Sequence, residues 1–210
     1  DIGFISNGTL ITEDIAETLI NSCTWIRISV DAATPEVYQK VHGMGEKIFN
    51  KTLNNLKMLV KKKKRLKSAV TIGVGFLTCE YTKRDMRRAA KLFKEIGVDY
   101  LQFRPMQIHD RGRFIYHPLD IEKEIKICMR ENTEDFSVLF SRHKYEMMKC
   151  KDYGRNYGKC FGHQFATVVG ADGKMYLCCH MRGHKEYCLG DLRKNTFREI
   201  WNSPQRRQVA

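Results

Sequence analysis

The first half of the chain alternates between two hydrophobic patterns. Four segments alternate apolar and polar residues with the period of a β-strand: 2–6, 25–31, 69–78 and 98–104. Between them, apolar residues recur every three or four positions, as on one face of a helix. Helices are expected to begin after Thr12 and Thr34 and near Thr82, and Gly97 is expected to end the third of them. Strands that alternate with helices predict an α/β fold with a parallel sheet covered by helices.

Polar side chains concentrate toward the carboxyl ends of these predicted strands, where the binding sites of α/β folds lie. The candidate binding residues are Asn7, Ser29, Asp31, Gln102 and Arg104. Their chemistry suits a small ligand that carries carboxylate, ammonium and hydroxyl groups. The alternative is that Ser29, Asp31 and Arg104 only cap and pair within the strand ends, because buried charges normally pair locally. No residue is assigned a catalytic role.

The second half of the chain is less regular. Its predicted elements are a helix over 121–129, a strand over 136–140, a β-hairpin over 165–177 and a capped helix over 196–209. Asp172–Gly173 is a strong turn signal within the hairpin. Because a hairpin folds the chain back on itself, Cys178 is expected to return near Cys160.

Five of the eight cysteines lie between residues 150 and 188. Such a cluster in a chain without a secretion signal indicates metal binding rather than a disulfide framework. The first candidate ligand set is Cys160, Cys178, Cys179 and Cys188, with Cys150, His180 and His184 as reserve ligands. Adjacent cysteines both bind a metal only where the backbone turns sharply, so the alternative is that one of Cys178 and Cys179 faces the core. Thiolates at this spacing suit an iron–sulfur cluster or a structural zinc ion, and free thiols are the remaining alternative.

The composition is that of a folded protein with an excess of positive charge. Hydrophobic residues make up 42% of the 210 positions, which excludes a disordered chain. The formal net charge is +13, which favours anionic partners. Part of this excess is the run 61–65, interpreted as a solvated helix end rather than a nucleic-acid patch. No apolar run is long enough to span a membrane and the first residues lack the basic region of a signal peptide, so we expect a cytoplasmic protein without membrane contact.

Several motifs resemble radical S-adenosylmethionine (SAM) enzymes. The opening motif of their SPASM and twitch extensions is similar to one spacing in this chain: Cys160 is followed after twelve residues by Gly173, and Gly173 after four residues by Cys178. Further segments carry the resemblance: SNGTL at 6–10, ISVDAA at 28–33, CLGDL at 188–192 and EIW at 199–201. The resemblance implies the C-terminal part of a partial (β/α)6 barrel over 1–117, with the last four β/α units. It implies a linker helix and a small α+β, cysteine-rich, SPASM/twitch-like domain over 118–210.

The same resemblance implies cofactors and roles. Ser29 and Asp31 would line a SAM pocket, while Asn7, Gln102 and Arg104 would contact SAM or substrate. The cysteine-rich domain would hold one auxiliary 4Fe–4S cluster. The implied activity is modification of a peptide or small anionic metabolite through a 5′-deoxyadenosyl radical, with an electron donor such as a flavodoxin or ferredoxin.

Two features of the family are missing from the sequence. The spacing CxxxCxxC, which binds the SAM-reducing cluster, does not occur, and neither does the glycine-glycine-glutamate stretch. Both are expected before Asp1, because the chain begins within a predicted strand. The second 4Fe–4S cluster is therefore expected on a missing N-terminal part, and the chain is predicted to be incomplete for SAM cleavage. The alternative function is a non-enzymatic binding module, stabilised by zinc or a cluster, for acidic partners or nucleic acid.

Overall fold

The computed structural model describes residues 1–106, 108–110, 113–115, 119–149 and 159–209, and side chains outside 107–118 and 147–158. The chain forms two compact units. The first unit comprises Asp1–Ile108 and Tyr116–Lys151, and the second comprises His109–Ile115 and Asp152–Ala210. The sequence-based domain boundary after residue 117 falls in a stretch outside the described residues and stays a prediction.

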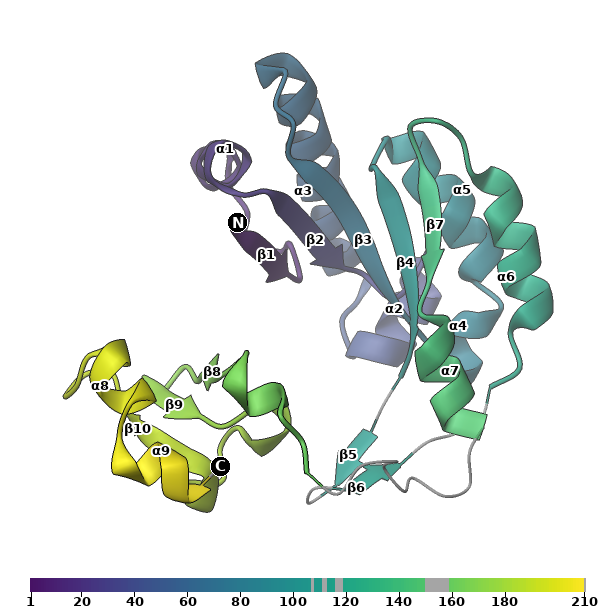
Figure 1. The fold of residues 1–210 in the computed structure, drawn as a ribbon. Helices are drawn as coiled ribbons and strands as arrows, with labels where there is room; N and C mark the ends of the chain where they lie inside the picture. The colour runs from purple at the N-terminus through teal and green to yellow at the C-terminus, as the bar shows by residue number, and fades with distance from the viewer. Residues whose placement is uncertain (107, 111–112, 116–118, 150–158, 210) are drawn as a thin grey trace. The chain divides into compact units, whose positions relative to one another are not determined.

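A five-stranded parallel sheet organises the first unit (Figure 1). Its strands are β1 (Gly3–Ser6), β2 (Trp25–Ser29), β3 (Thr71–Thr78), β4 (Tyr100–Pro105) and β7 (Ser137–Phe140). They are ordered β1-β2-β3-β4-β7, and every neighbouring pair is parallel. The predicted α/β class with a parallel sheet is therefore confirmed. Strands β5 (Ile108–Asp110) and β6 (Arg113–Ile115) form a separate two-stranded sheet.

Helices connect the parallel strands, and Figure 1 shows α3, α5 and α6 along one face of the sheet. The helices are α1 (Glu13–Ser22), α2 (Pro35–His42), α3 (Glu46–Leu66), α4 (Glu80–Lys83), α5 (Met86–Ile96), α6 (Glu122–Cys128) and α7 (Arg142–Lys149), with the 3-10 helix η1 (Met129–Glu131). Thr12 and Thr34 cap α1 and α2 as predicted, each accepting a backbone N–H. Gly97 ends α5 in the left-handed conformation that favours glycine. None of the described helices combines the length and hydropathy of a membrane span.

The main hydrophobic core lies between the sheet and these helices. Alternate strand residues face it and are almost fully buried: Ile26, Ile28, Ile72, Val74, Phe76, Leu101 and Phe103. Helix residues such as Leu56 and Phe93 complete the core from the opposite side. The period of two along each strand therefore assigns one face to packing, and it leaves the other face for polar residues.

The helix predicted to begin near Thr82 differs from the observed one. A short helix, α4, contains Thr82, and α5 begins only at Met86. Asp85 lies between them and is buried, and its Oδ2 accepts the backbone N–H groups of Ala33 at 2.6 Å and Thr34 at 3.1 Å. The Asp85 carboxylate therefore binds the start of α2 instead of capping its own helix.

The interpretation of the basic run as a solvated helix end is wrong for two of its residues. The Lys62 ammonium group is buried and contacts Glu13 Oε2 at 3.0 Å and Glu17 Oε2 at 2.9 Å. Lys63 Nζ lies 2.6 Å from Asp99 Oδ1. The end of α3 therefore joins α1 and the start of β4, and its positive charge is partly neutralised within the fold.

The second unit contains a three-stranded antiparallel sheet, ordered β10-β9-β8. Its elements are β8 (Val168–Val169), β9 (Lys174–Tyr176), β10 (Cys188–Asp191), α8 (Phe197–Trp201), α9 (Pro204–Val209) and the 3-10 helices η2 (Gly162–Gln164), η3 (Cys179–Met181) and η4 (Lys185–Tyr187). The predicted hairpin is confirmed, with Gly173 at a φ of 73° in its turn. The prediction of a single terminal helix is wrong. Helix α8 ends at Trp201 and α9 begins at Pro204, because a proline ring cannot continue a preceding helix.

Candidate functional site

One face of the parallel sheet turns away from the helices and carries most of the predicted binding residues. Strand β2 presents Trp25, Arg27 and Ser29 on this face, and β4 presents Tyr100, Gln102 and Arg104. All six are half-buried. The acidic side chains Asp and Glu are absent from the described strand positions that share this face. We call this surface the open face.

Two glycines of β3 lie beneath neighbouring side chains at the centre of the open face, and at Gly73 the close approach requires glycine. A Cβ atom on Gly73 would overlap the Tyr100 ring, so that ring occupies the space above Gly73. A Cβ atom on Gly75 would lie 3.4 Å from Arg27 Cδ. Burial is the main cause that raises the pKa of Tyr100. Strand β3 therefore contributes backbone at this surface, while β2 and β4 contribute the side chains.

Two arginines on the open face lack an anionic partner among the described residues. Arg27 Nη1 donates a hydrogen bond to Gln102 Oε1 at 2.8 Å, a neutral acceptor. Burial, and then the positive charge of Arg27, lower the pKa of Arg104. Arg27 was not among the predicted site residues, although it lies two positions before Ser29 and so on the same face. A half-buried pair of guanidinium groups without a counter-charge attracts an anionic ligand.

Asp31 occupies a different kind of position from the other candidates. It is buried, and it has a φ of 59°, just beyond β2. Its Oδ1 accepts the backbone N–H of Leu77 at 2.7 Å, and its Oδ2 lies 3.4 Å from His42 Nε2. The hydrogen bond from His42 to this carboxylate is the main cause that raises the pKa of the imidazole. Both oxygens of Asp31 thus have local partners, as the pairing alternative requires, and its role in SAM binding stays a prediction.

Asn7 and Ser29 lie at strand ends, as the sequence predicts. Asn7 is exposed, directly after β1, and its Oδ1 accepts hydrogen bonds from the Thr9 amide at 3.1 Å and the Thr9 hydroxyl at 2.9 Å. These bonds fix a local turn. Ser29 is half-buried and pairs with Gly75 in the sheet register. Their contacts with a ligand stay predictions, as do those of Gln102 and Arg104.

The second unit brings two of the predicted metal ligands onto neighbouring segments. Cys188 opens β10 and pairs with Tyr176 of β9. Next to this pair, the Leu177 amide donates to the Tyr187 carbonyl at 3.1 Å, and Cys178 follows directly. Cys178 and Cys188 therefore flank one backbone hydrogen bond, and Cys179 begins η3. Cys178 and Cys188 are half-buried, whereas Cys160 and Cys179 are exposed. All four are free thiols.

Helix α9 connects the segment that contains Cys160 with Cys188. Gln205 Nε2 donates to the Cys188 carbonyl at 2.9 Å. The next residue, Arg206, donates through Nη2 to the carbonyl of His163 at 2.9 Å, three residues after Cys160. Two consecutive side chains thus hold both segments on the same helix.

The donor set fits a thiolate-bound metal or cluster, because soft anionic sulfur is the ligand that iron–sulfur clusters and structural zinc share. Among the described residues, no three His, Cys, Asp or Glu side chains lie together as a metal site would require. The reserve ligand Cys150 lies outside the described residues. His184 is half-buried, with Nδ1 3.7 Å from Glu186 Oε1, and His180 lies in η3. The ligand set of Cys160, Cys178, Cys179 and Cys188 therefore stays a prediction.

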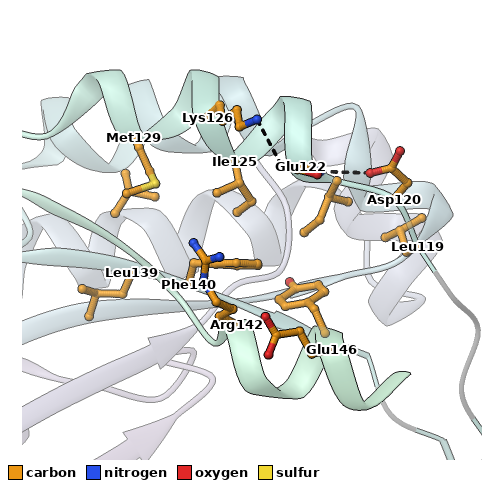
Figure 2. A pocket seen from close by; sticks show the side chains of 13 residues that line it. Leu119, Asp120, Glu122, Ile125, Lys126, Met129, Leu139, Phe140, Arg142 and Glu146 are labelled. Atoms are coloured by element: carbon orange, nitrogen blue, oxygen red, sulfur yellow. Dashed lines mark hydrogen bonds and ion pairs between the residues drawn. The ribbon is translucent and has the colours of Figure 1, made fainter. Parts of the chain in front are cut away.

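A cavity of about 410 Å³ lies elsewhere in the first unit, between α6, β7 and α7 (Figure 2). Apolar side chains such as Ile125, Met129 and Phe140 line it, together with Lys126 and Arg142. The described residues that line this cavity include none of the predicted site residues. We therefore treat the open face of the first unit and the cysteine segments of the second unit as two separate candidate sites.

Comparison with known proteins concerns the cysteine segments and the fold. The SPASM family model, described as an iron–sulfur cluster-binding domain, matches residues 160–210. A search of curated proteins finds no match.

Solved structures share the fold across both units. The structure of native anSMEcpe with bound AdoMet has a TM-score of 0.62 and 20% identity, and the match covers 99% of this chain and 58% of that one. Streptococcus suis SuiB bound to S-adenosylmethionine has a TM-score of 0.70 and 9% identity, covering 99% of this chain and 49% of that one. Streptococcus suis SuiB bound to the precursor peptide SuiA has a TM-score of 0.65 and 10% identity, covering 99% of this chain and 49% of that one.

The chain thus spans between 49% and 58% of the length of these solved proteins. At such low identity the likeness shows the fold, which confirms the predicted combination of partial-barrel sheet and small cysteine-rich domain. Residues 160–210 match the SPASM iron–sulfur cluster-binding family model, and the chain as a whole shares the fold of the solved anSMEcpe and SuiB structures with bound S-adenosylmethionine.

Proposed function

We propose that this chain is the C-terminal portion of a radical SAM enzyme that modifies a peptide or a small anionic metabolite. The observation that carries the proposal is the SPASM match over 160–210 in a chain whose parallel sheet leaves one polar face open. In this proposal, residues 1–117 belong to the barrel and residues 118–210 to the auxiliary domain. The auxiliary cofactor is one 4Fe–4S cluster held by Cys160, Cys178, Cys179 and Cys188.

The open face would bind and orient the substrate. SAM, when bound, supplies the 5′-deoxyadenosyl radical that removes a hydrogen atom from the substrate. Arg27 and Arg104 would bind a carboxylate of the substrate, because their charges lack an acidic partner among the described residues. Ser29 and Asp31 would contact SAM, as the resemblance implies. Trp25 and Tyr100 would limit the access of water to this surface.

A peptide substrate is the form we favour. Solved structures of similar fold contain peptides: anSMEcpe with the Cp18Cys peptide and SuiB with the precursor peptide SuiA. An acidic peptide would complement the net charge of +13. The proposal includes a flavodoxin or ferredoxin as electron donor. It also includes a cytoplasmic location, because free thiols suit a reducing compartment.

The proposal also predicts what this chain cannot do alone. The sequence contains no CxxxCxxC spacing, so we expect no SAM-reducing cluster within these 210 residues. The purified chain, reconstituted and supplied with dithionite and SAM, should yield no more 5′-deoxyadenosine than a variant without Cys160, Cys178 and Cys188. Production above that control would refute the incompleteness.

Anaerobic reconstitution with iron and sulfide tests the cofactor. We expect a brown protein with broad visible absorbance, and we expect both properties to disappear in the Cys178→Ala variant. Cys23→Ala is the matched control, because Cys23 lies in the first unit and should leave iron binding unchanged. A colourless protein that contains zinc would instead support the non-enzymatic binding module.

The binding module for acidic partners or nucleic acid has one observation in its favour, the high positive charge. However, Lys62 and Lys63 are paired within the fold, so part of this charge is unavailable to a polyanion. Binding of a generic RNA oligonucleotide with a steep dependence on salt concentration would favour the module. Weak binding at physiological salt would leave the enzyme as the better explanation.

A further inference from the structure

Three buried side-chain nitrogen atoms lack a hydrogen-bond partner among the described residues, and all three lie in the second unit. They are Nδ1 and Nε2 of His163 and Nε of Arg206. These two residues also contact each other, because Arg206 Nη2 donates to the His163 carbonyl at 2.9 Å. Buried polar groups are normally paired, since an unpaired one loses its hydration without compensation. Their concentration at one contact indicates that a polar group is bound there.

Other contacts hold both side chains in this position. The Arg206 guanidinium stacks over the Trp201 ring with its Cζ atom 3.9 Å from the centroid. Its Nη2 is occupied by the His163 carbonyl, so Nε–H remains available. A neutral imidazole offers one N–H donor and one acceptor, and a guanidinium offers donors only. His163 and Arg206 therefore present at least two N–H donors to the missing group, which must be rich in acceptors.

The position of this pair points to the identity of that group. His163 lies three residues after Cys160, and Gln205, next to Arg206, holds the Cys188 carbonyl. Two of the predicted cluster ligands therefore lie on the segments that meet at these donors. The sulfur atoms of an iron–sulfur cluster accept hydrogen bonds, and such bonds change its reduction potential.

We propose that His163 and Arg206 donate N–H hydrogen bonds to sulfur atoms of the auxiliary cluster and thereby raise its reduction potential. This inference rests on the proposed function, because it requires a cluster in residues 160–210. The direction follows from charge: reduction adds an electron to the cluster, and N–H donors stabilise the more negative state. Neither residue is a ligand in this assignment, so both act as positioning and tuning residues.

Redox titration of the reconstituted full chain, followed by visible absorbance and electron paramagnetic resonance, tests the proposal. We expect Arg206→Lys and His163→Phe to keep the iron content of the parent chain but to shift the potential to more negative values. Arg206→Lys keeps the charge and loses the Nε–H donor, so it separates hydrogen bonding from electrostatics. His163→Gln keeps a donor and should stay closer to the parent.

Arg207→Gln is the matched control. Arg207 lies beside Arg206 on α9, but its Nη2 donates to the Asn202 carbonyl at 3.1 Å, away from His163. Its removal should leave the potential unchanged. Iron content and far-ultraviolet circular dichroism of every variant show whether the domain has kept its fold.

Each outcome has a separate meaning. Equal potentials in Arg206→Lys, His163→Phe and the parent, at full iron content, would overturn the hydrogen-bond assignment alone. Loss of iron in both His163→Phe and His163→Gln, together with strong nitrogen hyperfine coupling in the parent, would overturn it in favour of imidazole ligation. A parent chain that binds no cluster would refute the proposed function itself.

Discussion

The two compact units reach stability by different routes. In the first unit, one core cluster of buried residues draws on strands β2, β3, β4 and β7 and on helices α1, α2, α3, α5 and α6, and the partly buried Phe4 of β1 packs against it. In the second unit, the core cluster contains three buried residues, Met175, Leu189 and Ile200. Small units with few buried apolar residues usually need a metal or disulfides. An iron–sulfur cluster in the second unit would therefore stabilise the fold of that unit as well as serve chemistry.

Removal of a cluster ligand should therefore have the largest effect, and only in the second unit. In Cys178→Ser, we expect loss of iron and rapid hydrogen exchange over 174–191, because structural metal sites contribute on the order of 10 kcal/mol to small domains. Exchange over 71–78 in the first unit should stay slow. Hydrogen exchange with mass spectrometry measures both segments in one experiment, with Cys23→Ser as control. Equal protection of 174–191 with and without iron would show that the small core is sufficient.

A cavity in the core of the first unit should give the next largest effect. Phe76 is almost fully buried and contacts Phe103 edge to face, with ring centroids 5.2 Å apart. We expect Phe76→Ala to lower the free energy of unfolding of the first unit by about 3–5 kcal/mol. Urea denaturation measures this loss, and Leu10→Ala, at an exposed position, should change it by about 0.5 kcal/mol or less. A loss that also exposes 174–191 to exchange would contradict the independence of the two units.

Overpacking of the open face should destabilise the first unit less. Because a Cβ atom at Gly73 would meet the Tyr100 ring, we expect Gly73→Ala to lower its free energy of unfolding by about 1–3 kcal/mol. The double variant Gly73→Ala/Tyr100→Ala should recover part of this loss. Gly45→Ala is the control, because its Cβ atom would meet nothing within 4 Å. If the double variant lost as much free energy of unfolding as the two single variants added together, the close approach of Tyr100 to β3 would be refuted.

The smallest expected effect is a pH dependence at the end of β2. Because the pKa of His42 is raised by its hydrogen bond to Asp31, folding favours the protonated imidazole. This stabilisation is complete below the unfolded pKa of about 6.5 and is lost as pH rises through the higher folded pKa. We expect it to amount to about 1 kcal/mol or less. Urea denaturation on both sides of this range should show the loss in the parent but not in His42→Gln, and equal pH profiles would contradict it.

Local signals in the sequence were sufficient to predict most of the first unit. The alternation of Ile26 and Ile28 with polar neighbours predicted both the strand and its buried face, and Thr12 and Thr34 predicted helix starts. The role of Asp85 could not be predicted in this way, because its partners lie about fifty residues away at the start of α2. The pairing of Lys62 with Glu17 is equally distant in sequence.

The candidate site was predictable in its chemistry but not in its arrangement. The cysteine spacing and the Asp172–Gly173 turn predicted that Cys178 returns along a hairpin. The hydrogen bonds from α9 to the cysteine segments were not predictable. They depend on the interruption of the helix before Pro204, which orients Gln205 and Arg206 toward those segments. Arg27 was missed for a simpler reason: the polar residues nearest the strand ends were favoured over those deeper in the strand.

The glycines of β3 have a consequence for how binding preference can change. A molecule over the middle of the sheet would meet Tyr100 and Arg27, which lie over the β3 glycines, so recognition depends on residues that β2 and β4 supply. Substitutions at Arg27, Gln102 or Arg104 can therefore alter which molecule is accepted while Ile72, Val74 and Phe76 keep their packing on the reverse side. The ligand selectivity of the open face and the stability of the core can therefore evolve separately in this sheet.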